Sequence, residues 1–195
     1  MNDVVGCETQ PSPGNVALCR AHMTKHNLPG PVIAVVWGGE FFVAGYTTFE
    51  RVAYFIEDAD AQTASSVTSL FETVASLLNV NRTGVDAVTE LGALASPDLQ
   101  APYDYAIDGA SPAKIDVSPT MRAIADDLGW KVPAHTIAGR FHETLVSVAL
   151  RIALRLRRSR GLSDVILGGS AFRNERLAAE LSQALATAAF SVYRG

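Results

Sequence analysis

Residues 163–177 read Ser-Asp-Val-Ile-Leu-Gly-Gly-Ser-Ala-Phe-Arg-Asn-Glu-Arg-Leu and contain the most informative pattern in the chain. The apolar run of residues 165–167 predicts a buried strand, Gly168 and Gly169 break it, and a helix-forming run follows Asn174. A glycine turn between a strand and a helix can bring backbone N–H groups close to a phosphate or a sugar. Ordinary packing of a helix on a sheet uses the same turn. The pattern alone leaves both a phosphate site and a purely structural turn open.

Bulk composition restricts the class of protein. The chain has 195 residues, of which 48% are hydrophobic and 18% charged, so we expect a single domain with a buried core. The formal net charge of −4 argues against a nucleic-acid-binding surface as the main function. Cys7 and Cys19 lack the spacing of a zinc site, and no apolar run reaches membrane-spanning length. We therefore expect a reduced, cytoplasmic protein that binds neither nucleic acid nor membrane.

Hydrophobic periodicity in the rest of the chain predicts a mixed α/β protein. Residues 1–14 are expected to form a loose leader before one domain over residues 15–195. A helix over residues 15–27, with Asn15 as its cap, precedes three strands that form an antiparallel meander. The expected strands outside the opening stretch lie at residues 32–37, 40–46, 49–56, 103–107, 113–117 and 190–193. The other expected helices lie at residues 65–78, 85–94, 118–128, 134–160 and 175–186.

Histidines and arginines leave chemical alternatives open. His22 and His26 are four residues apart, so on a helix they share a face and can share a metal ion, but no third ligand is apparent. His142 is either a site residue or a buried structural histidine. Arginines crowd the end of the helix expected over residues 134–160, where they either complement the helix dipole or bind an anion. The sequence has no Gly-x-Ser-x-Gly, Walker A or Gly-x-Gly-x-x-Gly pattern.

Five segments, in order along the chain, resemble one protein family. The opening stretch is similar to the "SGG-x-F-x-N-x-x-L" segment in the carbamoyltransferase half of the hydrogenase maturation factor HypF. Residues His26–Ile33 resemble the family's "EHGL-x-GPVI", and Trp37–Phe41 with Phe49–Ala53 resemble its "WGGEF…FERVA" hairpin. Residues Ser65–Leu78 resemble its "TSS-x-GRLFDAVAALL", and Ile137–His142 resemble its "IAARFH". The resemblance spans residues 15 to 193.

The resemblance implies a fold, a reaction and a cofactor. The implied fold is an α/β domain of the actin/Hsp70-like ATPase (ribonuclease H-like) type, with a mixed sheet and flanking helices, in a truncated form. The implied reaction is carbamoyl transfer through an adenylate, in the preparation of the cyanide ligands of nickel–iron hydrogenase. The implied cofactor is an ATP- or AMP-type nucleotide. The residues implied to contact it are Gly168, Gly169, Asn174, Glu90 and Gly84.

Departures from the family pattern affect its metal and phosphate groups. The family's metal-binding "HHAH" falls on residues 15–18, Asn-Val-Ala-Leu, which offer no such ligand set. Its first glycine- and aspartate-rich loop is missing between Val36 and Trp37. We therefore expect no metal cofactor, and metal-dependent chemistry that is weakened or lost. The alternative is a non-catalytic nucleotide-binding or scaffold protein derived from this family. The expected partner is a hydrogenase-maturation protein or a second copy of the chain.

Overall fold

One sheet is the frame of the molecule. The computed structural model describes residues 11–36, 40–44, 48–56, 65–80 and 84–194. Within these ranges, seven strands form a sheet in the order β4-β5-β3-β2-β1-β6-β7. The strands are β1 (Val32–Val36), β2 (Glu40–Ala44), β3 (Phe49–Ile56), β4 (Ala106–Ile107), β5 (Ala113–Asp116), β6 (Asp164–Gly168) and β7 (Ser191–Arg194).

Five of these strands run in the same direction. β6 is parallel to both β1 and β7, and β5 is parallel to β3. β2 joins β1 to β3 through two antiparallel pairings, which confirms the expected N-terminal meander. β4 is antiparallel to β5 at the end of the sheet. The carboxyl ends of β1, β3, β5, β6 and β7 therefore meet at one edge, where open α/β sheets place their ligands.

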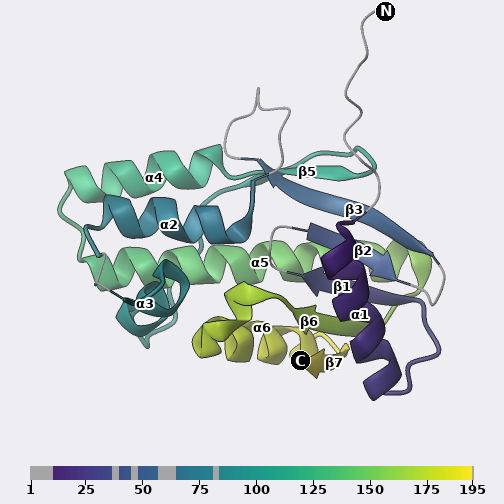
Figure 1. Cartoon of the computed structure of the whole chain (residues 1–195). Helices are drawn as coiled ribbons and strands as arrows, with labels where there is room; N and C mark the ends of the chain where they lie inside the picture. The colour runs from purple at the N-terminus through teal and green to yellow at the C-terminus, as the bar shows by residue number, and fades with distance from the viewer. Residues whose placement is uncertain (1–10, 37–39, 45–47, 57–64, 81–83, 195) are drawn as a thin grey trace, which may run out of the picture.

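Helices cover the two faces of the sheet unequally, as Figure 1 shows. α1 lies across one face, where Met23 packs on Ala34 of β1 in a small apolar cluster. Ile33 and Val35 point to the opposite face and enter the larger core, to which the other α-helices contribute. Because both faces are covered, β1 is apolar at every position. The helices are α1 (Pro13–Lys25), α2 (Val67–Leu77), α3 (Ala87–Leu94), α4 (Ser118–Gly129), α5 (Ala134–Arg160), η1 (Ser170–Arg173) and α6 (Glu175–Thr187).

The start of the first helix differs from the prediction. α1 begins at Pro13 with Ser12 as its cap, so Asn15 lies inside the helix and is not the cap. The Ser12 hydroxyl accepts a hydrogen bond from the backbone N–H of Asn15, and proline suits the first helical turn because its missing N–H would have no partner there. Residues 1–10 of the expected leader, and the expected turn at residues 37–39, lie outside the described residues.

The strand predicted over residues 103–107 is the other error, because β4 contains only Ala106 and Ile107. The backbone N–H of Tyr103 donates to Thr144 Oγ1 of α5 at 2.8 Å, so it is not available to a strand partner. The other expected helices and strands are present, and their ends agree within two residues wherever the structure describes them. No helix within the described ranges is long and apolar enough to cross a membrane.

Candidate functional site

A hollow opens where β6 ends. Its volume is ≈ 450 Å³, and it lies between α1, the glycine turn after β6, and β7. Its lining residues come from both ends of the chain: Leu18, His22, Leu167, Gly168, Gly169, Phe172, Arg173, Glu175 and Arg194. The two glycines of the opening sequence motif therefore lie at the surface of a cavity at the ligand-binding edge of the sheet.

The shape of this hollow depends on its two glycines. Gly169 has a φ of +100°, a backbone conformation that residues with a side chain rarely adopt. A Cβ on Gly168 would lie 2.8 Å from Cδ2 of Leu18, so a larger residue there would require the Leu18 side chain of α1 to shift. The turn thus serves two purposes, because it packs α1 against β6 and leaves backbone exposed to the hollow.

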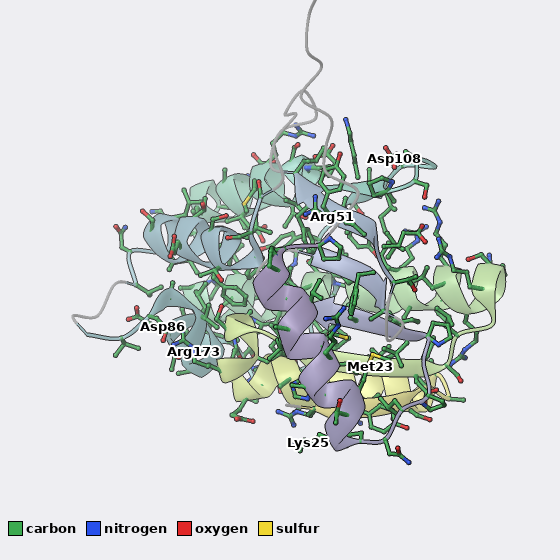
Figure 2. All side chains as sticks on the ribbon, turned by 45° about the vertical axis from the view of Figure 1, so that its right-hand side comes forward. Met23, Lys25, Arg51, Asp86, Asp108 and Arg173 are labelled. Atoms are coloured by element: carbon green, nitrogen blue, oxygen red, sulfur yellow. The ribbon has the colours of Figure 1, made fainter. Side chains whose placement is uncertain are left out.

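Two arginines give the hollow positive charge. Arg194 pairs with Glu175 across 3.1 Å, and Arg173 pairs with Asp86, which caps α3, across 3.7 Å. Figure 2 shows Asp86 and Arg173 next to each other beside α3. The Nε of Arg173 also donates to the backbone carbonyl of Ser170 at 3.3 Å. Both guanidinium groups are largely exposed, so either one can exchange its carboxylate for an incoming anion at little cost in free energy.

His22 is the buried polar group of the hollow. Its side chain is 8% exposed, and its Nδ1 has no hydrogen-bond partner. Burial, followed by the charge of Lys25 and by His26, lowers the pKa of His22. The ring stacks on that of His26 with centroids 6.3 Å apart. His22 therefore presents a neutral, incompletely paired imidazole at neutral pH.

The lining of the hollow does not fit a metal ion held by protein ligands. Among the described residues that line the hollow, His22 and Glu175 are the only side chains of metal-ligating type, and Glu175 is already paired with Arg194. Leu18, which occupies the last position of the family's histidine motif, presents an apolar side chain to this space. In the part of the chain that the structure describes, no three His, Cys, Asp or Glu side chains come together. We therefore assign no chemical step to a metal.

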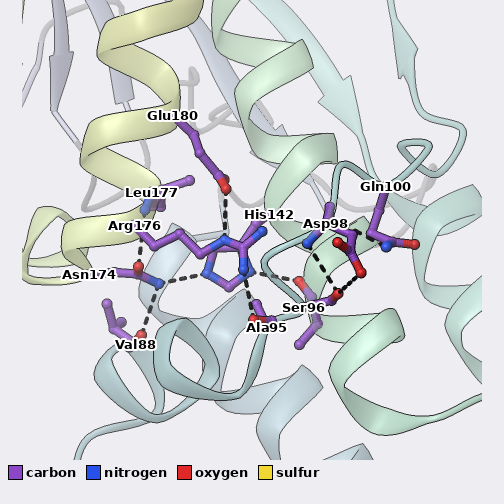
Figure 3. Close-up of polar contacts among 11 residues, drawn as sticks. Val88, Ala95, Ser96, Asp98, Gln100, His142, Asn174, Arg176, Leu177 and Glu180 are labelled. Atoms are coloured by element: carbon purple, nitrogen blue, oxygen red, sulfur yellow. Dashed lines mark hydrogen bonds and ion pairs between the residues drawn. The ribbon is translucent and has the colours of Figure 1, made fainter.

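Asn174 lies behind the turn and does not line the hollow. Its side chain is 2% exposed and makes three hydrogen bonds, shown in Figure 3. Its Oδ1 accepts from the backbone N–H of Leu177 at 3.1 Å and so caps α6. Its Nδ2 donates to the carbonyl of Val88 at 3.0 Å and to Nε2 of His142 at 2.7 Å. All the polar atoms of this amide are used within the protein.

His142 is a buried structural histidine. It is fully buried in α5, where Nδ1 donates to the carbonyl of Ala138 at 2.7 Å, which leaves Nε2 as the acceptor for Asn174. The pKa of His142 is lowered to about 4, chiefly by burial and also by the charge of Arg176, while the hydrogen bond to Ala138 opposes this change. The ring is therefore neutral at pH 7 and links α5 to the turn.

Glu90 and Gly84 lie away from the glycine hollow. Glu90 is 7% exposed and lines a second hollow of ≈ 280 Å³, on α3. Gly84 precedes α3 with a φ of +86° and lines neither space. Of the five residues predicted to contact the nucleotide, Gly168 and Gly169 line the glycine hollow, and Asn174, Glu90 and Gly84 do not. The structure adds His22, which the sequence marked only by its spacing to His26, and Arg173 and Arg194, for which the sequence signal is a charged side chain near a helix start or a strand end.

Comparison with known proteins places these features in a family. The family described as "Carbamoyltransferase, Kae1-like Domain, second subdomain" matches residues 55–195. No curated protein matches the chain significantly. A structure of full-length HypF in a phosphate- and nucleotide-bound form matches with a TM-score of 0.84 and 22% identity, over 93% of this chain and 39% of HypF. HypF of T. kodakarensis matches with a TM-score of 0.71 and 17% identity, over 92% of this chain and 33% of that one.

A third similar structure belongs to another kind of protein. The activator of the 2-hydroxyisocaproyl-CoA dehydratase from Clostridium difficile, with bound ADPNP, matches with a TM-score of 0.54 and 15% identity. That match covers 92% of this chain and 59% of the activator. Together these similarities confirm the expected mixed sheet of the actin/Hsp70-like ATPase type. The chain spans less than half the length of the HypF proteins that it matches.

Proposed function

The chain belongs to the family of the Kae1-like carbamoyltransferase domain, second subdomain, and we propose that it binds an ATP- or AMP-type nucleotide. The observation that carries this proposal is the hollow after β6, which is lined by a glycine turn, two arginines and a buried histidine. Backbone N–H groups and guanidinium groups are common phosphate donors in proteins. HypF and the dehydratase activator, which share the fold, are described with bound nucleotides.

The residues in and behind the glycine hollow have different roles in nucleotide binding. The nucleotide phosphates lie against Gly168 and Gly169, where the absence of a Cβ lets them approach the backbone. Arg173 and Arg194 exchange their carboxylate partners for phosphate oxygens. Asn174 is a positioning residue, because it holds the turn in place and is itself turned away. Glu90, to which the family resemblance assigns a ribose contact, lines a separate hollow and has no role in this proposal.

The proposed chemistry is reduced relative to the family. In carbamoyl transfer through an adenylate, a carbamate oxygen attacks the α-phosphorus of ATP and pyrophosphate leaves. This step requires positioning and neutralisation of the phosphate charge. Two exposed arginines supply part of that charge, and the lining has no set of metal ligands. We therefore propose nucleotide binding with weakened or lost transfer chemistry, in a complex with a hydrogenase-maturation protein or a second copy of the chain.

Calorimetric titration of the full chain with ATP, ADP and AMP tests the binding proposal. We expect saturable heat for at least one nucleotide, and affinity at least tenfold weaker in the double variant Arg173→Ala, Arg194→Ala. The matched control is Arg122→Ala, which removes an exposed arginine on α4, away from the hollow. Absence of heat with all three nucleotides, with and without Mg²⁺ or Zn²⁺, would overturn the proposal.

A separate measurement distinguishes an enzyme from a binding protein. Pyrophosphate release from ATP in the presence of a carbamoyl donor reports formation of the adenylate. We expect nucleotide binding without release above the uncatalysed rate. Release that is lost in the double arginine variant and retained in Arg122→Ala would instead establish catalysis at this hollow.

A further inference from the structure

A second surface, remote from the glycine hollow, carries an arginine stripe on α5. Arg151, Leu154, Arg155 and Arg158 follow the i, i+3, i+4, i+7 spacing of one helix face, and all four are exposed. They line a groove of ≈ 590 Å³ together with Ile152 and the segment Tyr105–Ile107, which includes β4. This lining holds three arginines and no carboxylate, in a chain whose formal net charge is −4.

The helix dipole accounts for only part of this stripe. Its effect falls off within the last turn of a helix, where Arg158 lies. Arg151 lies nine residues before the helix end at Arg160, so it gains no such stabilisation. Like charges at i, i+3 and i, i+4 instead destabilise a helix by about 0.2–0.5 kcal/mol a pair. Arg151 and Arg155 therefore repel each other, and no carboxylate in the lining of the groove offsets this repulsion.

The three guanidinium groups of the stripe are not equivalent. Arg155 donates to the backbone carbonyls of Asp108, Gly109 and Ala110, at 3.0, 3.4 and 3.4 Å, and so holds the turn between β4 and β5. Arg151 lies over the ring of Tyr105, 5.8 Å from its centroid. Within the described ranges, neither Arg151 nor Arg158 forms an ion pair. These two arginines lie about 10 Å apart along the helix axis, at about 1.5 Å per residue.

The other wall of the groove is a sheet edge. Among the described strands, β4 is the first in the sheet order and pairs with β5 on one side only. An edge strand offers backbone donors and acceptors to another extended chain, and Ala106 and Ile107 line the groove. Leu154 is 38% exposed in the same groove and offers an apolar contact.

From these observations we propose that the groove between β4 and the stripe binds an extended, acidic segment of a partner protein. The segment adds a short strand to β4, and its carboxylates pair with Arg151 and Arg158. An apolar side chain of the segment packs on Leu154. This docking surface is independent of the nucleotide hollow and shares no lining residue with it.

Fluorescence anisotropy with the full chain and a labelled ten-residue peptide that alternates glutamate with leucine tests the proposal. We expect saturable binding that is at least tenfold weaker in the double variant Arg151→Glu, Arg158→Glu and unchanged in Arg122→Glu. Arg155 is left intact because it holds the β4–β5 turn. Hydrogen exchange of the segment that contains β4 is expected to slow when the peptide binds.

Three binding results would overturn the proposal. They are the absence of saturable binding, an equal loss of binding in Arg122→Glu, and tighter binding of single-stranded DNA of the same charge, which would make the surface a polyanion site. Unchanged exchange at β4 in the bound state would exclude pairing with the strand. Unchanged far-ultraviolet dichroism of each variant shows that any lost binding is not lost folding.

Discussion

At the scale of single residues, Asn174 and His142 connect three helices. The Asn174 side chain caps α6 and bonds Val88 of α3, and it donates to His142 of α5. A buried polar group without a partner costs about 1–3 kcal/mol, so each member of such a network depends on the others. The hydrogen bonds of Asn174 behind the glycine turn therefore help to hold it in position.

Removing the amide of Asn174 is expected to destabilise the protein strongly. Asn174→Ala removes a helix cap and leaves Nε2 of His142 buried without its donor, which together cost about 2–4 kcal/mol. Urea unfolding followed by circular dichroism measures this loss. The control is Ser12→Ala, which removes the exposed cap of α1 and should cost about 1 kcal/mol. Equal effects of the two substitutions would contradict the proposed network.

His142 is expected to make stability depend on pH. Its pKa is about 4 in the folded protein and about 6.5 in the unfolded chain, so below pH 6.5 the unfolded state binds a proton that the folded state refuses. Stability therefore falls as pH decreases from 6.5 to 4, by an amount on the order of 3 kcal/mol. Urea unfolding across this range measures the slope. His142→Gln keeps an acceptor for Asn174 and does not titrate, so a slope as steep as that of the wild type would contradict the assignment.

At the scale of elements, close approach between α3 and the turn explains a glycine inside a helix. A Cβ on Gly92 of α3 would lie 2.6 Å from Oδ1 and 2.7 Å from Nδ2 of Asn174. The amide cannot withdraw without breaking its three hydrogen bonds. Helix propensity alone favours alanine over glycine by about 1 kcal/mol, so at this position tertiary contact opposes local preference.

Gly92→Ala is therefore expected to destabilise the protein by about 1–3 kcal/mol, because the new methyl group overpacks a fixed amide. Gly129→Ala is the matched control, since Gly129 ends α4 and a Cβ there would meet nothing within 4 Å. That substitution is expected to be neutral or to stabilise by up to about 1 kcal/mol. Thermal unfolding of the two variants gives the comparison, and stabilisation by both would show that Asn174 can move.

At the scale of the whole molecule, the sheet is covered by many helices on one face and by α1 on the other. The small cluster under α1 holds the first helix against the strands whose carboxyl ends form the glycine hollow. The stability of this cluster therefore controls whether Leu18 and His22 reach that hollow. Among the described residues, the buried apolar side chains of α1 belong to this small cluster and not to the large core.

Met23→Ala is expected to destabilise the protein by about 2–4 kcal/mol, because Met23 is fully buried between α1 and the sheet. Met121→Ala on α4 is the control, since Met121 is half-buried at the margin of the large core and should cost less. Urea unfolding measures both variants. A smaller loss for Met23→Ala than for Met121→Ala would mean that α1 contributes little to folding.

The sequence by itself determined the elements and the family. Periodicity located the long helix α5 and the strands β1, β3 and β6, because helix and strand patterns are local and repeat along the chain. The pattern missed the start of α1, where Ser12 competes with Asn15 as the cap, and it extended β4 over Tyr103. Both errors depend on single hydrogen bonds, and the second partner, Thr144, is 41 residues away.

Which of the predicted site residues lie together in one hollow depends on the tertiary structure. Gly168 and Gly169 line the hollow, whereas the Asn174 side chain turns inward and Glu90 lies in a separate space. Arg194 and His22 join the glycines and the neighbouring Arg173 from distant positions in the sequence, and Arg151 meets β4 only because α5 passes the end of the sheet. Local spacing fixes which face of a helix or strand a side chain occupies. Contacts between residues far apart in the sequence decide which other helix or strand packs opposite that face. A binding site forms between the surfaces of two or more such elements.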